Sequence, residues 1–241
     1  MSLIVTLYVP EGLVIAGDSR LTLSWTTKTD KGEQLHAVSA SDTNTKIFSI
    51  KNKFGLGTFG VADIKGIPIS GFINQFTEEK VTDETTIDQL PQLLLDFFGD
   101  NFGNPATYFY AIGYKVENGI SVPYAYHINV SGKTFNRVNH SNGQVFQGAN
   151  WGGETEVLMR ILNTVKLKQG DNWIDLTDTP LAFNFMTLQD AIDFADYAIR
   201  TTIDTIRFQQ KEKTVGGPID ILIVKPNETP IWIKRKELHC D

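Results

Sequence analysis

Residues 3–20 read Leu-Ile-Val-Thr-Leu-Tyr-Val-Pro-Glu-Gly-Leu-Val-Ile-Ala-Gly-Asp-Ser-Arg, and this stretch decides which fold the chain can adopt. Two apolar runs, residues 3–9 and 13–16, flank the turn-forming residues 10–12, which predicts a β-hairpin. Both runs are nearly continuous rather than alternating. We therefore expect both faces of these strands to be covered by other parts of the protein.

The residue that precedes this hairpin is Ser2, which directly follows the initiator Met1. Serine is small enough for an initiator methionine to be removed, and removal of Met1 would leave Ser2 with both a hydroxyl group and a free α-amine. An α-amine has a reference pKa of roughly 7.7–8.0, so it can act as a general base near neutral pH. Ser2 is therefore a candidate nucleophile that would carry its own base.

The composition predicts a single domain spanning residues 1–241. A chain of 241 residues with 41% hydrophobic and 11% aromatic content can bury one large core. The net charge of −6 and the pI near 5.3 argue against nucleic acid or an anionic membrane as a partner. No run approaches the ~20 apolar residues of a membrane helix, and residues 1–6 lack the basic segment of a secretion signal, so we expect a cytoplasmic protein. The lone cysteine, Cys240, excludes an internal disulfide.

The rest of the chain alternates between strand and helix patterns. The predicted elements are a hairpin at 46–59, helices at 62–76 and 87–98, strands at 106–114, 122–130 and 134–138, a helix at 154–166, and strands at 219–224 and 230–234. Residues 21–43 are rich in polar side chains and predict an exposed excursion. The clearest helix starts at Thr187, which forms a capping-box pattern with Asp190 before a long apolar stripe. This order of elements is typical of an α+β protein.

Several short motifs, taken together, resemble those of N-terminal nucleophile hydrolases, and in particular the β subunits of proteasomes and their bacterial relatives. Ser2 is followed at the family's spacing by Asp18 in Ala-Gly-Asp-Ser-Arg, and Lys46 opens a later strand in Thr-Lys-Ile-Phe-Ser-Ile. Lys46 comes later than is usual for the family, which we interpret as a loop insertion at residues 21–43. Gly60 ends Gly-Thr-Phe-Gly, which resembles the strand end where a glycine amide forms the oxyanion hole.

Two further segments resemble the same family. Gln147-Gly148-Ala149 is similar to the Gly-Ser-Gly turn near the nucleophile, with Ala149 in place of the usual serine. Residues 215–220, Val-Gly-Gly-Pro-Ile-Asp, are similar to the segment that leads into a late strand. The matches extend from residue 2 to about residue 225 and so cover nearly the whole chain.

The resemblance implies a four-layer αββα sandwich, in which two stacked, mainly antiparallel sheets carry helices outside, the 187–209 helix among them. It implies that Ser2 attacks, that Lys46 lowers the pKa of the nucleophile, that Asp18 supports Lys46, and that Gly60 stabilises the oxyanion. The implied activity is hydrolysis of an amide bond, most simply in a peptide. The implied assembly is a ring-like homo-oligomer. The substrate, the ring symmetry and any ATP-dependent unfoldase partner do not follow from the sequence.

Each of these residues also has an ordinary structural interpretation, because Asp18 could cap a turn, Lys46 could be an exposed lysine, and Gly60 could simply permit a tight strand end. Retained Met1 would block the Ser2 amine, and serine lacks the methyl group that restrains χ1 in the family's usual threonine. Ala149 also lacks a hydroxyl that often supports the amine. The alternatives are a catalytically silent proteasome-like subunit that acts as a scaffold or binding module, and an amidase for a small amide.

Other kinds of site find no support in the sequence. The four histidines, His36, His127, His140 and His239, show no metal-ligand spacing. The glycine-rich residues 148–153 lack the Lys-Ser/Thr of a phosphate loop. We therefore expect neither a metal nor a cofactor.

Overall fold

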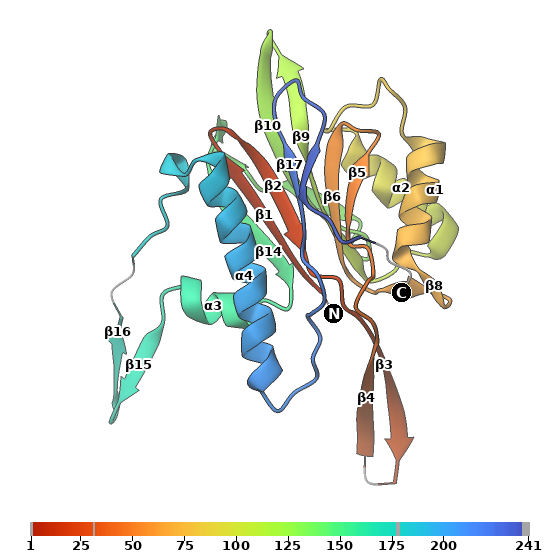
Figure 1. Cartoon of the computed structure of the whole chain (residues 1–241). Coiled ribbons are helices and arrows are strands. Elements are labelled where there is room, and N and C mark those ends of the chain that lie inside the picture. The colour runs from red at the N-terminus through yellow and green to blue at the C-terminus, as the bar shows by residue number, and fades with distance from the viewer. Residues whose placement is uncertain (1, 31, 177–178, 238–241) are drawn as a thin grey trace.

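The computed structural model describes residues 2–30, 32–176 and 179–237 of the chain. Met1, His239 and Cys240 lie outside the described residues. Figure 1 shows two β-sheets at the centre, with α3 and α4 on one side and α1 and α2 on the other.

Both large sheets are antiparallel throughout. In spatial order the first sheet contains β14 (Gly148–Gly153), β1 (Leu3–Val9), β2 (Gly12–Gly17), β17 (Asp220–Val224) and β18 (Ile231–Lys234). The second contains β11 (Thr134–Arg137), β10 (Ile120–Asn129), β9 (Thr107–Glu117), β6 (Phe54–Gly60) and β5 (Ile47–Ile50).

The helices and the small hairpins complete the described structure. The helices are α1 (Ile69–Lys80), α2 (Leu90–Phe102), α3 (Glu156–Leu162), α4 (Leu188–Phe208) and the short 3₁₀ helix η1 (Phe183–Phe185). The hairpins are β3 (Leu21–Thr29) with β4 (Gly32–Ser41), β7 (Asp63–Ile64) with β8 (Ile67–Pro68), β12 (His140–Ser141) with β13 (Gln144–Val145), and β15 (Lys166–Gln169) with β16 (Asn172–Asp175). None of the helices within the described ranges is long and apolar enough to cross a membrane.

The N-terminal hairpin is confirmed, and its burial explains the continuous apolar pattern. β1 pairs with β2 from Ile4 opposite Gly17 to Val9 opposite Gly12, and every residue of both strands is buried. Successive side chains of a strand point to opposite faces. Leu3 and Leu7 accordingly pack in the cluster that contains α3 and α4, whereas Ile4 packs against the second sheet. Both faces are covered, so both kinds of position must be apolar.

Three apolar clusters hold the layers together. One lies between the first sheet and helices α3 and α4, and another lies between the second sheet and helices α1 and α2. The third joins the two sheets through residues such as Ile15 of β2 and Ile112 of β9. The protein is therefore α+β, with mostly antiparallel sheets and few helices.

Helix α4 begins where its capping pattern predicts. The Asp190 backbone N–H donates to the Thr187 hydroxyl oxygen at 3.1 Å, and the Thr187 N–H donates to the Asp190 carboxylate at 2.8 Å. This reciprocal capping box satisfies two amides that would otherwise lack partners at the helix start. The apolar stripe of α4, which includes Ala195 and Ile199, packs on β1 and β2.

Two predicted helices differ from the observed elements. The helix expected at 62–76 begins only at Ile69 and runs to Lys80. The hairpin β7–β8 takes the first part of the expected range, because Lys65 and Gly66 both have positive φ angles, 53° and 80°, and form its two-residue turn. The helix expected at 154–166 ends early at Leu162, since the chain becomes extended at Asn163. The following residues pair as β15 and β16 instead.

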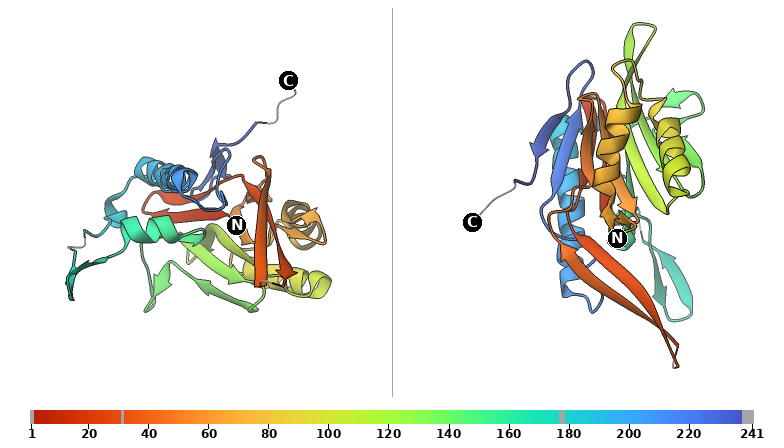
Figure 2. Two further views of the ribbon diagram at one scale, coloured as in Figure 1. Left: turned by 90° about the horizontal axis from the view of Figure 1, so that it is seen from below. Right: turned by 90° about the vertical axis from the view of Figure 1, so that its right-hand side faces the viewer.

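The polar excursion at residues 21–43 is a long two-stranded hairpin. β3 and β4 pair from Leu21 opposite Ser41 to Thr29 opposite Gly32. This hairpin projects away from the two sheets, as Figure 1 and the right view of Figure 2 show. It leaves and rejoins the body between β2 and β5, which agrees with its interpretation as an insertion.

Candidate active site

Ser2 is fixed through its backbone at the start of β1. Its carbonyl oxygen accepts from the Glu154 N–H at 2.8 Å, and the next amide, Leu3 N–H, donates to Asp18 Oδ1 at 2.9 Å. Gly153 lies so close that a Cβ atom there would be 1.8 Å from the Ser2 carbonyl oxygen, and its φ of 99° also favours glycine. The peptide between Ser2 and Leu3 is thus held at both polar atoms. Ser2 itself is buried.

Asp18 lies directly after β2 and joins three segments of the chain. Its Oδ1 accepts from Leu3 N–H and from Lys46 Nζ, the latter at 2.8 Å. Its Oδ2 accepts from the backbone N–H groups of Arg20, at 3.1 Å, and Gly216, at 3.0 Å. Four donors thus surround one buried carboxylate and stabilise its negative charge. Asp18 is a structural centre of the site as well as the partner of Lys46.

Lys46 is brought to Asp18 as the sequence predicts. It lies one residue before β5, and its side chain is 3% exposed while that of Asp18 is 0% exposed. Burial disfavours the ammonium ion and lowers the pKa of Lys46, while the neighbouring Asp18 carboxylate acts in the opposite direction. The net effect is a lysine whose pKa lies below its ordinary value. In its charged form, held by Asp18, Lys46 can supply positive charge to a nearby oxygen.

Gly60 ends β6 in a backbone conformation that other residues rarely adopt. Its φ is 99°, and a Cβ atom there would lie 2.5 Å from the carbonyl oxygen of Ala106. Thr107 Oγ1 donates to the Phe59 carbonyl at 3.3 Å, so this carbonyl faces β9. In a trans peptide the N–H points opposite to the C=O. The Gly60 N–H therefore points away from β9, toward the edge where Thr58 N–H donates to the Lys46 carbonyl at 3.0 Å.

One predicted correspondence is wrong. Ala149 was expected near Ser2 in the Gln147-Gly148-Ala149 segment, but β14 pairs with β1 so that Ala149 lies opposite Leu7 and Gly153 lies opposite Leu3. Strand residues are spaced by about 3.3 Å, so four positions of register place Ala149 well away from the N-terminal end. The residues beside Ser2 are instead Gly153 and Glu154, and the lack of a hydroxyl at Ala149 does not bear on the site.

The structure also adds residues that the sequence did not single out. Glu154 is bound at Oε2 by the Thr214 hydroxyl at 3.0 Å and at Oε1 by Lys211 Nζ at 3.1 Å. Arg20 forms a bidentate ion pair with Asp42, at 2.6 and 2.7 Å. The only sequence signal for the Glu154 cluster was the glycine pair that precedes it. The segment from residue 215 leads into the late strand β17, as its resemblance implied, and its contact with the site, from Gly216 N–H to Asp18, is a further finding of the structure.

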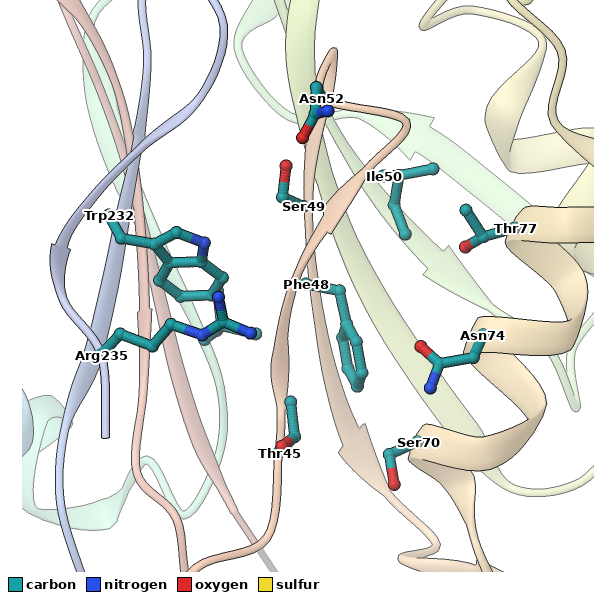
Figure 3. Close-up of a pocket in the computed structure, with 11 residues that line it drawn as sticks. Thr45, Phe48, Ser49, Ile50, Asn52, Ser70, Asn74, Thr77, Trp232 and Arg235 are labelled. Carbon is teal, nitrogen blue, oxygen red and sulfur yellow. The ribbon is translucent and has the colours of Figure 1, made fainter. Parts of the chain in front are cut away.

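A cavity of about 440 Å³ runs along β5, and Lys46 is not among its lining residues. It starts at Thr45 and is lined on one side by Ser70, Asn74 and Thr77 of α1, and on the other by Trp232 and Arg235 (Figure 3). Its lining is mainly uncharged and polar, with Arg235 as its single ionic group. Among the described residues, no group of three or more His, Cys, Asp or Glu side chains could hold a metal ion.

Comparison with known proteins identifies the class of fold. No protein-family model matches the sequence, and no curated protein matches it. Chains of solved structures do match, and they show that the fold is proteasome-like. One of them is the Gly-1 mutant of Anbu from Hyphomicrobium sp. strain MC1, a bacterial proteasome-like protein, which matches with a TM-score of 0.58 and 17% identity over 98% of this chain and 86% of the Anbu chain. At this identity the likeness concerns the fold alone.

Proposed function

We propose that the protein hydrolyses an amide bond, with Ser2 as the nucleophile after removal of Met1. The observation that carries this proposal is the shared carboxylate oxygen of Asp18. The same Oδ1 atom binds Lys46 Nζ at 2.8 Å and the amide that follows Ser2 at 2.9 Å. One carboxylate oxygen thereby holds the buried Lys46 ammonium close to the backbone of Ser2, the first residue after Met1 is removed.

The proposed reaction has two steps. The Ser2 α-amine takes the proton from the Ser2 hydroxyl, and the oxygen attacks the substrate carbonyl carbon. Collapse of the tetrahedral intermediate breaks the C–N bond, the leaving amine takes the proton, and an ester with Ser2 remains. Water, activated by the same α-amine, then attacks this ester. The acid product leaves and the Ser2 hydroxyl is restored.

The surrounding groups supply electrostatic stabilisation. The Lys46 ammonium favours the Ser2 alkoxide and lowers the pKa of the α-amine, and Asp18 orients Lys46. The Gly60 N–H points toward the Lys46 edge of β6 and is the proposed oxyanion donor. Loss of one such donor typically costs about 2.7–4 kcal/mol of transition-state stabilisation. A substrate carbonyl bound between Gly60 and Ser2 would accept a hydrogen bond from the Gly60 N–H and would present its carbon to the Ser2 hydroxyl.

We assign the chain to the proteasome β-subunit-like N-terminal nucleophile hydrolases, as one domain with the four-layer αββα arrangement, acting on peptides in the cytoplasm. The proteasome-like fold and the helix-covered sheets support this assignment. A ring-like homo-oligomer that encloses the sites is part of the proposal.

The competing function is a catalytically silent subunit that acts as a scaffold or binding module. It is favoured by the burial of Ser2, which is 5% exposed, since a buried serine that keeps Met1 offers neither its amine nor its hydroxyl to a substrate. An amidase for a small amide shares the Ser2 chemistry and differs only in substrate. Removal of Met1 therefore separates both enzymes from the scaffold.

The test compares two forms of one chain. A cleavable N-terminal fusion releases protein that begins at Ser2, while a second preparation keeps Met1, and intact mass verifies both. We expect the Ser2 form to hydrolyse a pool of fluorogenic peptide amides and small aryl amides, and the Met1 form to be inactive. Ser2→Ala should match the Met1 form, and Ser131→Ala, at an exposed turn, should match the wild type. Equal turnover in the Ser2 and Met1 forms would contradict the proposal.

A further inference from the structure

A second Lys–Asp pair lies beside the first one. Lys236 Nζ forms an ion pair with Asp220 Oδ2, and the Lys236 backbone N–H donates to Asp220 Oδ1 at 2.8 Å. The side chains of Lys236 and Asp220 are 8% and 3% exposed. Transfer of each charge from water into the protein costs free energy even when the two are paired, so stability alone does not explain this pair.

Asp220 faces the space between the two sheets. It starts β17, where its register partner is Gly17, the residue before Asp18. Leu222 of the same strand packs between the sheets, whereas Ile221 packs under α4. Because side chains alternate, Asp220 shares the face of Leu222. The Asp220 carboxylate is therefore directed at the second sheet from the end of β17 that adjoins the site.

The start of β5 lies opposite this face. A Cβ atom at Gly17 would be 3.0 Å from Ile47 Cδ1, so Ile47 packs directly on the Gly17 backbone. Lys46 is the residue before Ile47. Burial is the main cause that lowers the pKa of Lys46, and the positive charges of Lys236 and Arg20 act in the same direction.

We propose that the buried Asp220–Lys236 ion pair, placed opposite the start of β5, acts electrostatically on Lys46 from the C-terminal segment. Lys236 is thus a positioning residue for the Ser2 chemistry, and the inference rests on the proposed function for its biological purpose. The charged groups around Lys46 are Asp18 at the end of β2, Arg20 with its partner Asp42, Lys236 with its partner Asp220, and the α-amine of a trimmed Ser2.

The two partners should have opposite effects on Lys46. Lys236→Met removes a positive charge and leaves Asp220 negative, so the Lys46 ammonium becomes easier to form. Asp220→Asn leaves Lys236 uncompensated, so the ammonium becomes harder to form. If the pair only held the local structure together, its loss would loosen the packing around Lys46 in both variants. The pKa of Lys46 would then move toward its ordinary value in both.

The test measures Lys46 directly and needs no turnover. The full chain is labelled with ¹³C-lysine, the Lys46 Cε resonance is assigned by its loss in Lys46→Arg, and its titration midpoint is followed by NMR. We expect Lys236→Met to raise the midpoint by about one pH unit, and Asp220→Asn to lower it by a similar amount. Lys234→Met, at an exposed position that pairs with Asp196, is the matched control and should leave the midpoint unchanged.

The double variant Asp220→Asn/Lys236→Met guards against misfolding of the single ones, because it leaves no unpaired buried charge. Its midpoint should lie between those of the two single variants. Shifts in the same direction for both single variants, or a double variant that titrates outside their range, would overturn the inference. Opposite shifts together with an inactive Ser2 form would retain the electrostatic inference and reject the proposed function, so the two failures are distinguishable.

Discussion

Breaking the Asp18–Lys46 pair tests whether the site is as buried and as connected as described. Lys46→Met keeps the length of the side chain but removes the cation, and it leaves the Asp18 carboxylate inside the protein with only backbone donors. Removal of one partner of a buried ion pair typically costs about 3–5 kcal/mol. Because three backbone N–H groups still bind Asp18, we expect about 3 kcal/mol. For a chain of this size this corresponds to a fall in Tm of roughly 6–12 °C.

Asp18→Asn should be more damaging than Lys46→Met. An asparagine offers one oxygen in place of two, so its NH₂ group would face either Leu3 and Lys46 or Arg20 and Gly216, all of which are donors. The variant therefore loses hydrogen bonds and places donors against each other. The role of Asp18 is wider than the orientation of Lys46 that its sequence motif implies.

The assay is urea unfolding followed by far-UV circular dichroism, with equal m-values as the condition for comparison. Lys115→Met is the matched control, because Lys115 pairs with Asp88 at 2.6 Å with about a third of each side chain exposed, and such pairs contribute about 0–1 kcal/mol.

The pH dependence of stability gives a second check. The pKa of Lys46 is lowered in the folded protein, so between that lowered pKa and 10.5 the unfolded chain binds more protons, and stability rises with pH across this window. Lys46→Met should lose this rise. A Lys46→Met variant no less stable than Lys115→Met would refute the argument.

Three other predictions follow from the described contacts. Gly119→Ala, with a φ of 81° and open space around it, should lose only the about 1–3 kcal/mol of stability that the strained backbone costs. Gly60→Ala should lose more than this control in urea unfolding, because its Cβ would also collide with the Ala106 carbonyl oxygen. Burial lowers the pKa of His127 below 6.5, so the unfolded chain binds more protons just below that pH and stability falls on acidification; His127→Gln should flatten this fall in pH-dependent unfolding. Thr187→Ala should lower stability by about 1 kcal/mol through loss of the capping box, whereas Thr155→Ala, at a helix start without a side-chain cap, should have a smaller effect by thermal unfolding.

The parts of the fold that local patterns encode could be predicted from the sequence. The hairpin of residues 3–17 follows from two apolar runs around a turn, and the start of α4 follows from Thr187 and Asp190. The meeting of Asp18 with Lys46 was predicted by resemblance of motifs, and the long hairpin β3–β4 explains the added distance in sequence between them.

What the sequence missed depends on register between distant strands. The pairing register between β14 and β1 decides whether Ala149 or Gly153 lies beside Ser2. The segments around these two residues both contain glycine, so the sequence alone does not distinguish them. The pairing of Asp220 with Lys236 depends on how the chain leaves β18, which has a bulge in its pairing with β17 between Ile221 and Leu222. Neither choice is encoded in a local pattern.

The central claim is that Ser2 acts with its own α-amine. An epoxyketone bonds to both the hydroxyl and the amine of one residue, so it reports on the two groups together. Intact-mass and peptide mass spectrometry after incubation with an epoxyketone should show a single adduct on Ser2 in the protein released at Ser2, and none in Ser2→Ala or in the form that keeps Met1. A free Ser2 that forms no adduct, or an equal adduct in the Met1 form, would contradict the account.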